Sequence, residues 1–165
     1  MTRTRSRVRR RLIAAVICAA VLLSPIAAAA VISLQNDAAA AAVKDQLVAM
    51  DLPPESAFVA SYARAGKLVG NGNGMQYLGA ILIRSDLTTA ELDAHYAAQA
   101  DALDQRRTSE YPVSIEVLPT GSAELDEIRG ISGFLADAGG PDEYVVYMWG
   151  AAPSPLHADW DLRGH

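Results

Sequence analysis

The beginning of the chain constrains its fold more than any other part. Six arginines and no acidic residue stand within the first 11 residues, and residues 12–34 then contain no charged residue. A helix of this length would span roughly 34 Å, at about 1.5 Å per residue, and the hydrocarbon core of a bilayer is about 30 Å thick. The sequence therefore predicts a transmembrane anchor at residues 12–34, with the lipid bilayer as a partner of the chain.

The charge on the two sides of this segment predicts its orientation. Segments rich in Lys and Arg stay on the cytoplasmic side of a membrane. Residues 1–11 are therefore expected to form a basic cytoplasmic N-terminus, and everything after residue 34 is expected outside the cell membrane. The remaining eight Lys and Arg face nineteen Asp and Glu, so residues 12–165 carry a formal charge of -11. An arginine-rich arm for nucleic acid is the alternative, but the adjoining apolar run favours membrane insertion, and no nucleic-acid partner is expected.

The sequence leaves open whether this segment is retained or removed as a signal peptide. Small residues between Ser24 and Ala30 offer a cleavage site near Ala30. The apolar run continues through Val31 and Ile32 to spanning length, which favours a retained anchor. Cys18 does not indicate a lipoprotein, because the bulky Ile17 precedes it where a lipoprotein signal needs a small residue.

Composition divides the exported part into three segments. Residues 35–52 are rich in alanine and carry apolar residues at helical spacing (Val43, Leu47, Met50), which predicts a juxtamembrane helix. Pro53 and Pro54 end that helix, because proline lacks the amide donor and disfavours a helical residue before it. A domain is expected at residues 53–153, and an irregular tail at residues 154–165.

Residue patterns within the domain predict four strands and two helices. Strands are expected at residues 58–65, 75–84, 111–117 and 144–149, and the second has apolar residues on both faces, as a central strand does. Thr88 and Glu91 form a capping-box pattern flanked by Leu87 and Leu92, which predicts the start of a helix. A short helix and loop are expected at residues 122–137. We therefore predict an α+β fold: a two-layer domain with helices packed on one face of a mainly antiparallel four-stranded sheet.

A glycine-rich loop is the most conspicuous candidate site. Gly70-Asn71-Gly72-Asn73-Gly74 tolerates positive φ, and its amides, with Lys67 nearby, are able to form a concave site for an anion. A phosphate loop precedes a helix, however, whereas a strand is expected here, so a flexible hairpin connection is favoured. The weak ligand-binding candidates are Lys67, Asn71 and Asn73.

The histidines give little indication of catalysis or metal binding. His95 lies beside the apolar stripe of the predicted helix, and Asp93, two residues away, does not face it. Four potential metal ligands lie in the tail, which has no predicted element to fix their geometry: His157, Asp159, Asp161 and His165. We expect no catalytic residue, no bound metal and no cofactor.

Three segments carry a resemblance: residues 66–77, residues 85–87 and the ending at residues 155–165. They are similar to small, alanine-rich, single-pass membrane proteins of actinobacteria that are themselves uncharacterised. The resemblance implies a tethered extracytoplasmic domain and assigns no site residue. Two functions stay open: a non-enzymatic binding or interaction module of the cell envelope, with another envelope protein as its partner, or a small extracytoplasmic enzyme or ligand-binding domain that uses the 70–74 loop.

Overall fold

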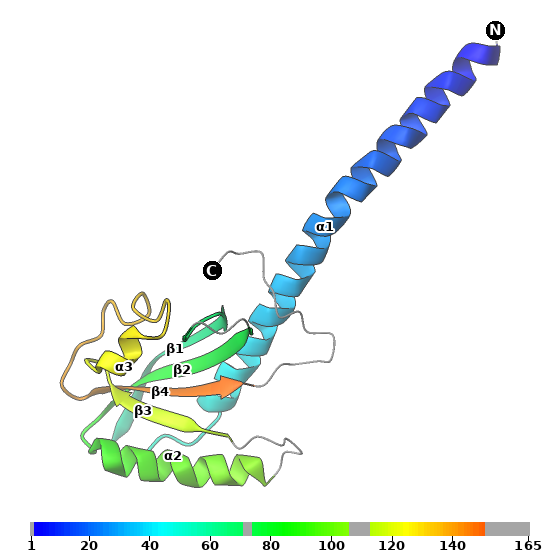
Figure 1. Cartoon of the computed structure of the whole chain (residues 1–165). Coiled ribbons are helices and arrows are strands. Elements are labelled where there is room, and N and C mark those ends of the chain that lie inside the picture. The colour runs from blue at the N-terminus through cyan, green and yellow to red at the C-terminus, as the bar shows by residue number, and fades with distance from the viewer. Residues whose placement is uncertain (1, 71–73, 106–112, 151–165) are drawn as a thin grey trace.

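The computed structural model describes residues 2–70, 74–105 and 113–150. A long helix, α1 (Thr2–Val48), leads into a sheet with two further helices (Figure 1). The elements that follow α1 are β1 (Ser56–Gly66), β2 (Gln76–Ser85), α2 (Thr89–Asp104), β3 (Ile115–Pro119), α3 (Ala123–Asp126) and β4 (Glu143–Gly150). The predicted α+β fold with a four-stranded antiparallel sheet is confirmed.

The sheet has the strand order β1-β2-β4-β3, and every neighbouring pair is antiparallel. β1 and β2 form a long hairpin in which Gly66 pairs with Gln76 and Ser56 with Ser85, with a bulge between Phe58 and Ala60. β2 lies between β1 and β4 and is buried on both faces over most of its length. The prediction of a central strand at this position is therefore confirmed.

α2 covers one face of the sheet and begins as the sequence predicts. The Thr88 hydroxyl accepts from the Glu91 amide at 3.4 Å, and the Glu91 carboxylate accepts from the Thr88 amide at 2.8 Å. This reciprocal pair satisfies two amides that the first helical turn would leave free. Leu92 and Tyr96 are buried against Ile81, Ile83 and other apolar residues of that face.

α3 and the loop after it cover the opposite face of the sheet. A short helix was predicted in this segment, but it was expected on the same face as α2. Leu125, Ile128 and Ile131 are buried against Leu78, Ala80 and other residues of that face. The physical reason lies in β2, whose alternate side chains are apolar on both sides, so each face of the sheet requires a cover.

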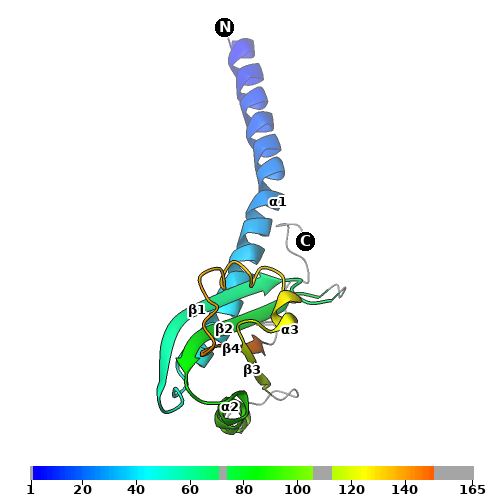
Figure 2. The same ribbon diagram turned by 90° about the vertical axis from the view of Figure 1, so that its left-hand side faces the viewer.

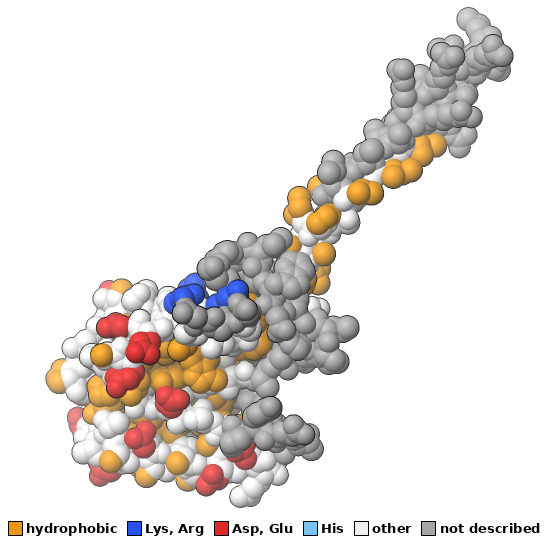
Figure 3. Space-filling view, viewed as in Figure 1, with side chains coloured by type: hydrophobic (Ala, Val, Ile, Leu, Met, Phe, Trp, Pro, Cys, Tyr) orange, Lys and Arg blue, Asp and Glu red, His pale blue; other side chains and the backbone are white. Residues whose placement is uncertain are grey.

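The first part of α1 projects from the domain (Figures 1 and 2). Seven large apolar side chains of this part are exposed, as the orange atoms along the helix show (Figure 3): Ile13, Ile17, Val21, Leu23, Ile26, Val31 and Leu34. Among the described residues, one helical stretch, Leu23–Val48, is long and apolar enough to cross a membrane by length and composition. Pro25 lies inside the helix without ending it.

The last turns of α1 belong to the core of the domain. The side chains of Asn36, Ala40, Val43 and Leu47 are buried. The contact is so close that a Cβ atom on Gly79 would lie 2.5 Å from the Lys44 amide nitrogen, so only glycine fits at that position of β2. The helical stripe from Asn36 to Leu47 thus packs on sheet surface that α2 leaves free, although the folded domain was expected to begin only at Pro53. The predicted helix at residues 35–52 continues from the preceding one and ends at Val48, before the two prolines.

Candidate functional site

The glycine-rich loop joins β1 to β2 at one end of the sheet. The side-chain oxygen Oε1 of Gln76 accepts from the amides of Leu68 and Val69, at 2.7 and 2.8 Å. Gly70 has a φ of 68°, a conformation that glycine adopts without strain. The next described element is a strand, β2, which begins at Gln76, whereas a phosphate loop leads into a helix. These features are those of a hairpin connection closed by Gln76.

Of the three weak ligand-binding candidates, the structure describes Lys67 alone. Its side chain is half-buried, and its carbonyl accepts from Arg129 Nη1 at 3.3 Å. Asn71 and Asn73 lie outside the described residues, so the predicted ligand site at the loop stays a prediction. The tail residues His157, Asp159, Asp161 and His165, for which no bound metal was expected, also lie outside the described residues. Within residues 2–70, 74–105 and 113–150, no group of three His, Cys, Asp or Glu is placed to hold a metal ion.

His95 takes part in a polar contact between α2 and the segment after α1. Its Nε2 lies 2.8 Å from the carbonyl oxygen of Asp51 and 2.8 Å from Nε2 of Gln99, so one ring tautomer donates to the carbonyl and the other accepts from the amide. Gln99 binds the same backbone twice, because Nε2 donates to the Asp51 carbonyl at 2.9 Å and Oε1 accepts from the Asp51 amide at 3.0 Å. The two side chains therefore fix α2 to the chain that leaves α1.

Lys67 and His95 lie at different ends of the domain and form no common site. The hairpin end that carries Lys67 lies near the start of the buried part of α1, where Tyr77 donates to Asn36 at 3.1 Å. His95 contacts Asp51, beyond the end of α1. Among the described residues, Lys67 and His95 therefore do not share a pocket.

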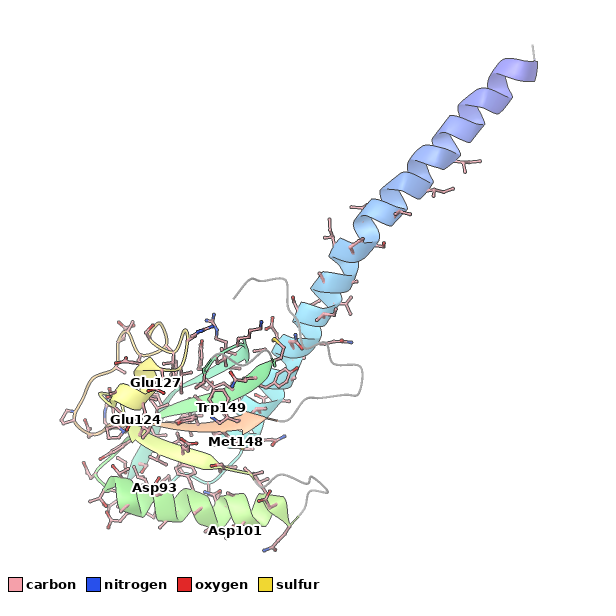
Figure 4. All side chains as sticks on the ribbon, in the orientation of Figure 1. Asp93, Asp101, Glu124, Glu127, Met148 and Trp149 are labelled. Carbon is pink, nitrogen blue, oxygen red and sulfur yellow. The ribbon has the colours of Figure 1, made fainter. Side chains whose placement is uncertain are left out.

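The described surface includes two hollows near these residues. The larger one, about 490 Å³, lies between the end of α1 and α2, and Gln99, the polar side chain on its α2 wall, is already bound to Asp51. The smaller one, about 280 Å³, lies beside the hairpin end and is lined by Val69, Met75, Gln76, Tyr77, Trp149 and Gly150. Trp149 extends from β4 next to Met148 (Figure 4). Neither lining contains a histidine or a paired carboxylate.

Glu143 is the most strongly perturbed carboxylate among the described residues. It accepts from the amides of Gly139 and Gly140, at 2.9 and 3.1 Å, and from Arg84 Nη2 at 2.7 Å. These bonds, with that from Gly139 foremost, lower the pKa of Glu143 to about 2. Since all three donors belong to the turn before β4 and to β2, the group fastens the start of β4 to the sheet.

Two tyrosines have raised pKa values for structural reasons. Burial raises the pKa of Tyr96 to about 12, and its hydroxyl has no hydrogen-bond partner among the described residues. Burial and a hydrogen bond to Glu116 raise the pKa of Tyr147. Both hydroxyls therefore stay protonated at neutral pH.

Sequence reasoning missed the three polar groups that organise these contacts: Gln76, Gln99 and the Arg84–Glu143 pair. Arg84 and Glu143 are direct partners in the β2–β4 register, a pairing that becomes visible only once the strand order is known. Gln99 lies seven residues after Leu92, on the same stripe of α2, where an amide signals a backbone partner.

Comparison of the chain with protein-family models, with curated proteins and with solved structures finds no match.

Proposed function

We propose that the chain is a single-pass membrane protein whose extracytoplasmic domain serves as a non-enzymatic interaction module. The observation that carries the proposal is the continuity of α1, which passes from the exposed apolar side chains of its first part into the core of the domain without a break. Helical side chains such as Ile17 and Ile26 need a cover that water does not supply, and a bilayer supplies it. The resemblance to single-pass membrane proteins agrees with this architecture.

The proposed orientation follows from the arginines. With six of them in the first 11 residues, the N-terminus is retained in the cytoplasm and the domain lies outside. Leu34 is 68% exposed, whereas Asn36 is buried in the domain, so no flexible linker separates the proposed span from the folded part. A domain mounted in this way is held at the membrane surface in a defined orientation, which suits contact with a neighbouring envelope protein.

One of the two edges of the sheet, the β1 edge, offers the surface for such a contact. In the described sheet β1 pairs on one side only, with β2, and carries two exposed large apolar side chains, Phe58 and Val59. A partner that contributes a strand or an apolar surface would cover both the unpaired backbone and these side chains. We propose this edge as the contact surface.

The alternative function is a small enzyme or ligand-binding domain that uses the loop at residues 70–74. The hollow of about 280 Å³ beside this loop favours it, because Trp149 and Met75 provide apolar walls. Against it, Gln76 already binds the hairpin backbone and Lys67 is absent from the lining. The described walls thus offer an apolar ligand a surface but no acid or base for catalysis.

Photocrosslinking in native membranes tests the proposal. A photoreactive amino acid at Phe58 is expected to give a discrete adduct with one membrane protein. The matched control is the same replacement at Asp101, which is exposed on α2, far from the β1 edge (Figure 4). Similar adducts from both positions, or none from Phe58, would refute the interaction surface.

A further inference from the structure

Three cationic residues from two segments of the chain lie at the hairpin end of the domain. Arg129 follows α3; its amide donates to the Leu68 carbonyl at 2.9 Å and its Nη1 to the Lys67 carbonyl at 3.3 Å. Arg64 of β1 lies over the next residue, since a Cβ atom on Gly130 would fall 2.2 Å from Arg64 Nη1. We call Arg64, Lys67 and Arg129 the basic cluster.

The charges of the basic cluster are not neutralised by the described part of the protein. The other described cations of the domain are paired, Lys44 with Asp45 and Arg84 with Asp142 and Glu143. None of the three cluster residues has an ion-pair partner among the described residues. Arg64 and Arg129 are exposed, so their guanidinium groups are open to an external anion.

The basic cluster stands out against an acidic background, because residues 12–165 carry a formal charge of -11. Exposed carboxylates lie on α2 (Asp93, Asp101), on α3 (Glu124) and directly after α3 (Glu127) (Figure 4). On the face shown in Figure 3, the blue side chains gather close to where α1 leaves the domain, and the red side chains spread over the remainder. Positive charge is thus concentrated at the end of the domain from which the apolar helix emerges.

The height of the basic cluster along α1 corresponds to the headgroup layer. Tyr77 contacts Asn36 and pairs with Ala65 in the hairpin, so this end of the sheet lies level with Asn36. Asn36 is two residues beyond the uncharged run at residues 12–34, a rise of about 3 Å. The polar layer on each side of a bilayer is roughly 5–7 Å thick. The hairpin continues past Tyr77 to Lys67, further toward the proposed membrane.

We propose that the basic cluster binds the phosphate groups of anionic phospholipids in the membrane that α1 crosses. This inference rests on the proposed anchor. Guanidinium groups of Arg64 and Arg129 form paired hydrogen bonds with phosphate oxygens, and Lys67 adds a third positive charge. The contact braces the domain against the bilayer on the side of the sheet opposite α1, and so fixes the direction in which the β1 edge points.

Energy transfer from the domain to labelled lipids tests the inference on the full chain in nanodiscs. With Cys18→Ala, a donor dye is placed at Gly74→Cys, where an added Cβ meets no atom within 4 Å. The discs contain mostly phosphatidylcholine with a trace of headgroup-labelled phosphatidylglycerol or, in the parallel sample, headgroup-labelled phosphatidylcholine. We expect stronger transfer to the anionic lipid, with a local enrichment up to roughly fivefold per cation, and loss of the difference at high salt.

Two variants separate charge from folding. The triple variant Arg64→Gln, Lys67→Gln, Arg129→Gln is expected to give equal transfer to both lipids. The variant Arg64→Lys, Arg129→Lys keeps the charge at the same positions and is expected to retain the preference. The arginines at residues 3–11 are unchanged in both variants and lie across the bilayer from the donor in the proposed topology.

Each contrary result has its own meaning. Equal transfer to the two lipids in the unsubstituted chain, or an undiminished preference in the triple variant, would overturn the inference while the anchor stands. A chain that elutes without the nanodiscs would contradict the anchor, and the inference would fall with it.

Discussion

Leu47→Ala measures how much the end of α1 contributes to the folded domain. Leu47 has no exposed surface and lies in a cluster with Ile81, Ile83, Leu92 and Tyr96. Truncation of a leucine in such a site loses its transfer free energy and leaves a cavity, at a cost of about 2–5 kcal/mol in the free energy of unfolding. With a loss of about 3 kcal/mol and a urea dependence of about 1.5 kcal/mol per molar, the midpoint falls by about 2 M.

Urea unfolding of residues 33–165, followed by tryptophan fluorescence, provides the assay, because this fragment omits the projecting part of α1 and keeps Asn36, Val43 and Leu47. Val48→Ala is the matched control, since Val48 is the next residue of the same helix and is 45% exposed. Its expected cost is below about 0.5 kcal/mol. Equal small shifts for the two variants would show that the end of α1 is a tether outside the core, and the reasoning would be refuted.

Three further variants test particular contacts by the same unfolding assay. Thr88→Ala removes the cap of α2 and is expected to cost about 1 kcal/mol; an unchanged midpoint would contradict the role of the capping box. Because the folded-state pKa of Glu143 is lowered to about 2 from the ordinary 4.5, its contribution is present above pH 4.5 and lost as the pH falls toward 2. Glu143→Gln should therefore lower the midpoint at pH 7 and flatten its decline in acid, and a variant with the unchanged acid profile would argue against this assignment. Tyr96→Phe removes a buried hydroxyl with no described partner and should leave the free energy of unfolding unchanged or raise it by up to about 1 kcal/mol. A clear decrease in this free energy would indicate an unrecognised hydrogen bond.

The features that sequence predicted best are those set by near neighbours in the chain. The capping box at Thr88 and Glu91 depends on residues three apart, and the two apolar faces of β2 follow from its alternation alone. Both were confirmed because no distant contact competes with them.

Contacts between distant segments explain what the sequence did not predict. α1 ends at Val48, four residues before the predicted end at residue 52. The prolines at residues 53 and 54 do not indicate that Val43 and Leu47 pack on the sheet, because the matching Gly79 lies in another element. The position of α3 depends on which sheet face α1 and α2 leave free. The same reason applies to the basic cluster, because Arg64, Lys67 and Arg129 come together only through the hairpin register and the loop after α3.

The central claim is that α1 is a retained anchor with the domain outside the cell. Labelling of intact cells with a membrane-impermeant maleimide tests it most directly, with two single-cysteine variants of a Cys18→Ala chain, Asp101→Cys on α2 and Thr4→Cys in the arginine-rich end. The account predicts that the first variant is labelled in intact cells and that the second is labelled only after the membrane is dissolved. The claim would be contradicted if the cysteine at position 101 were protected from the reagent in intact cells. It would also be contradicted if the mature chain began near Val31 and so lacked the cysteine at position 4.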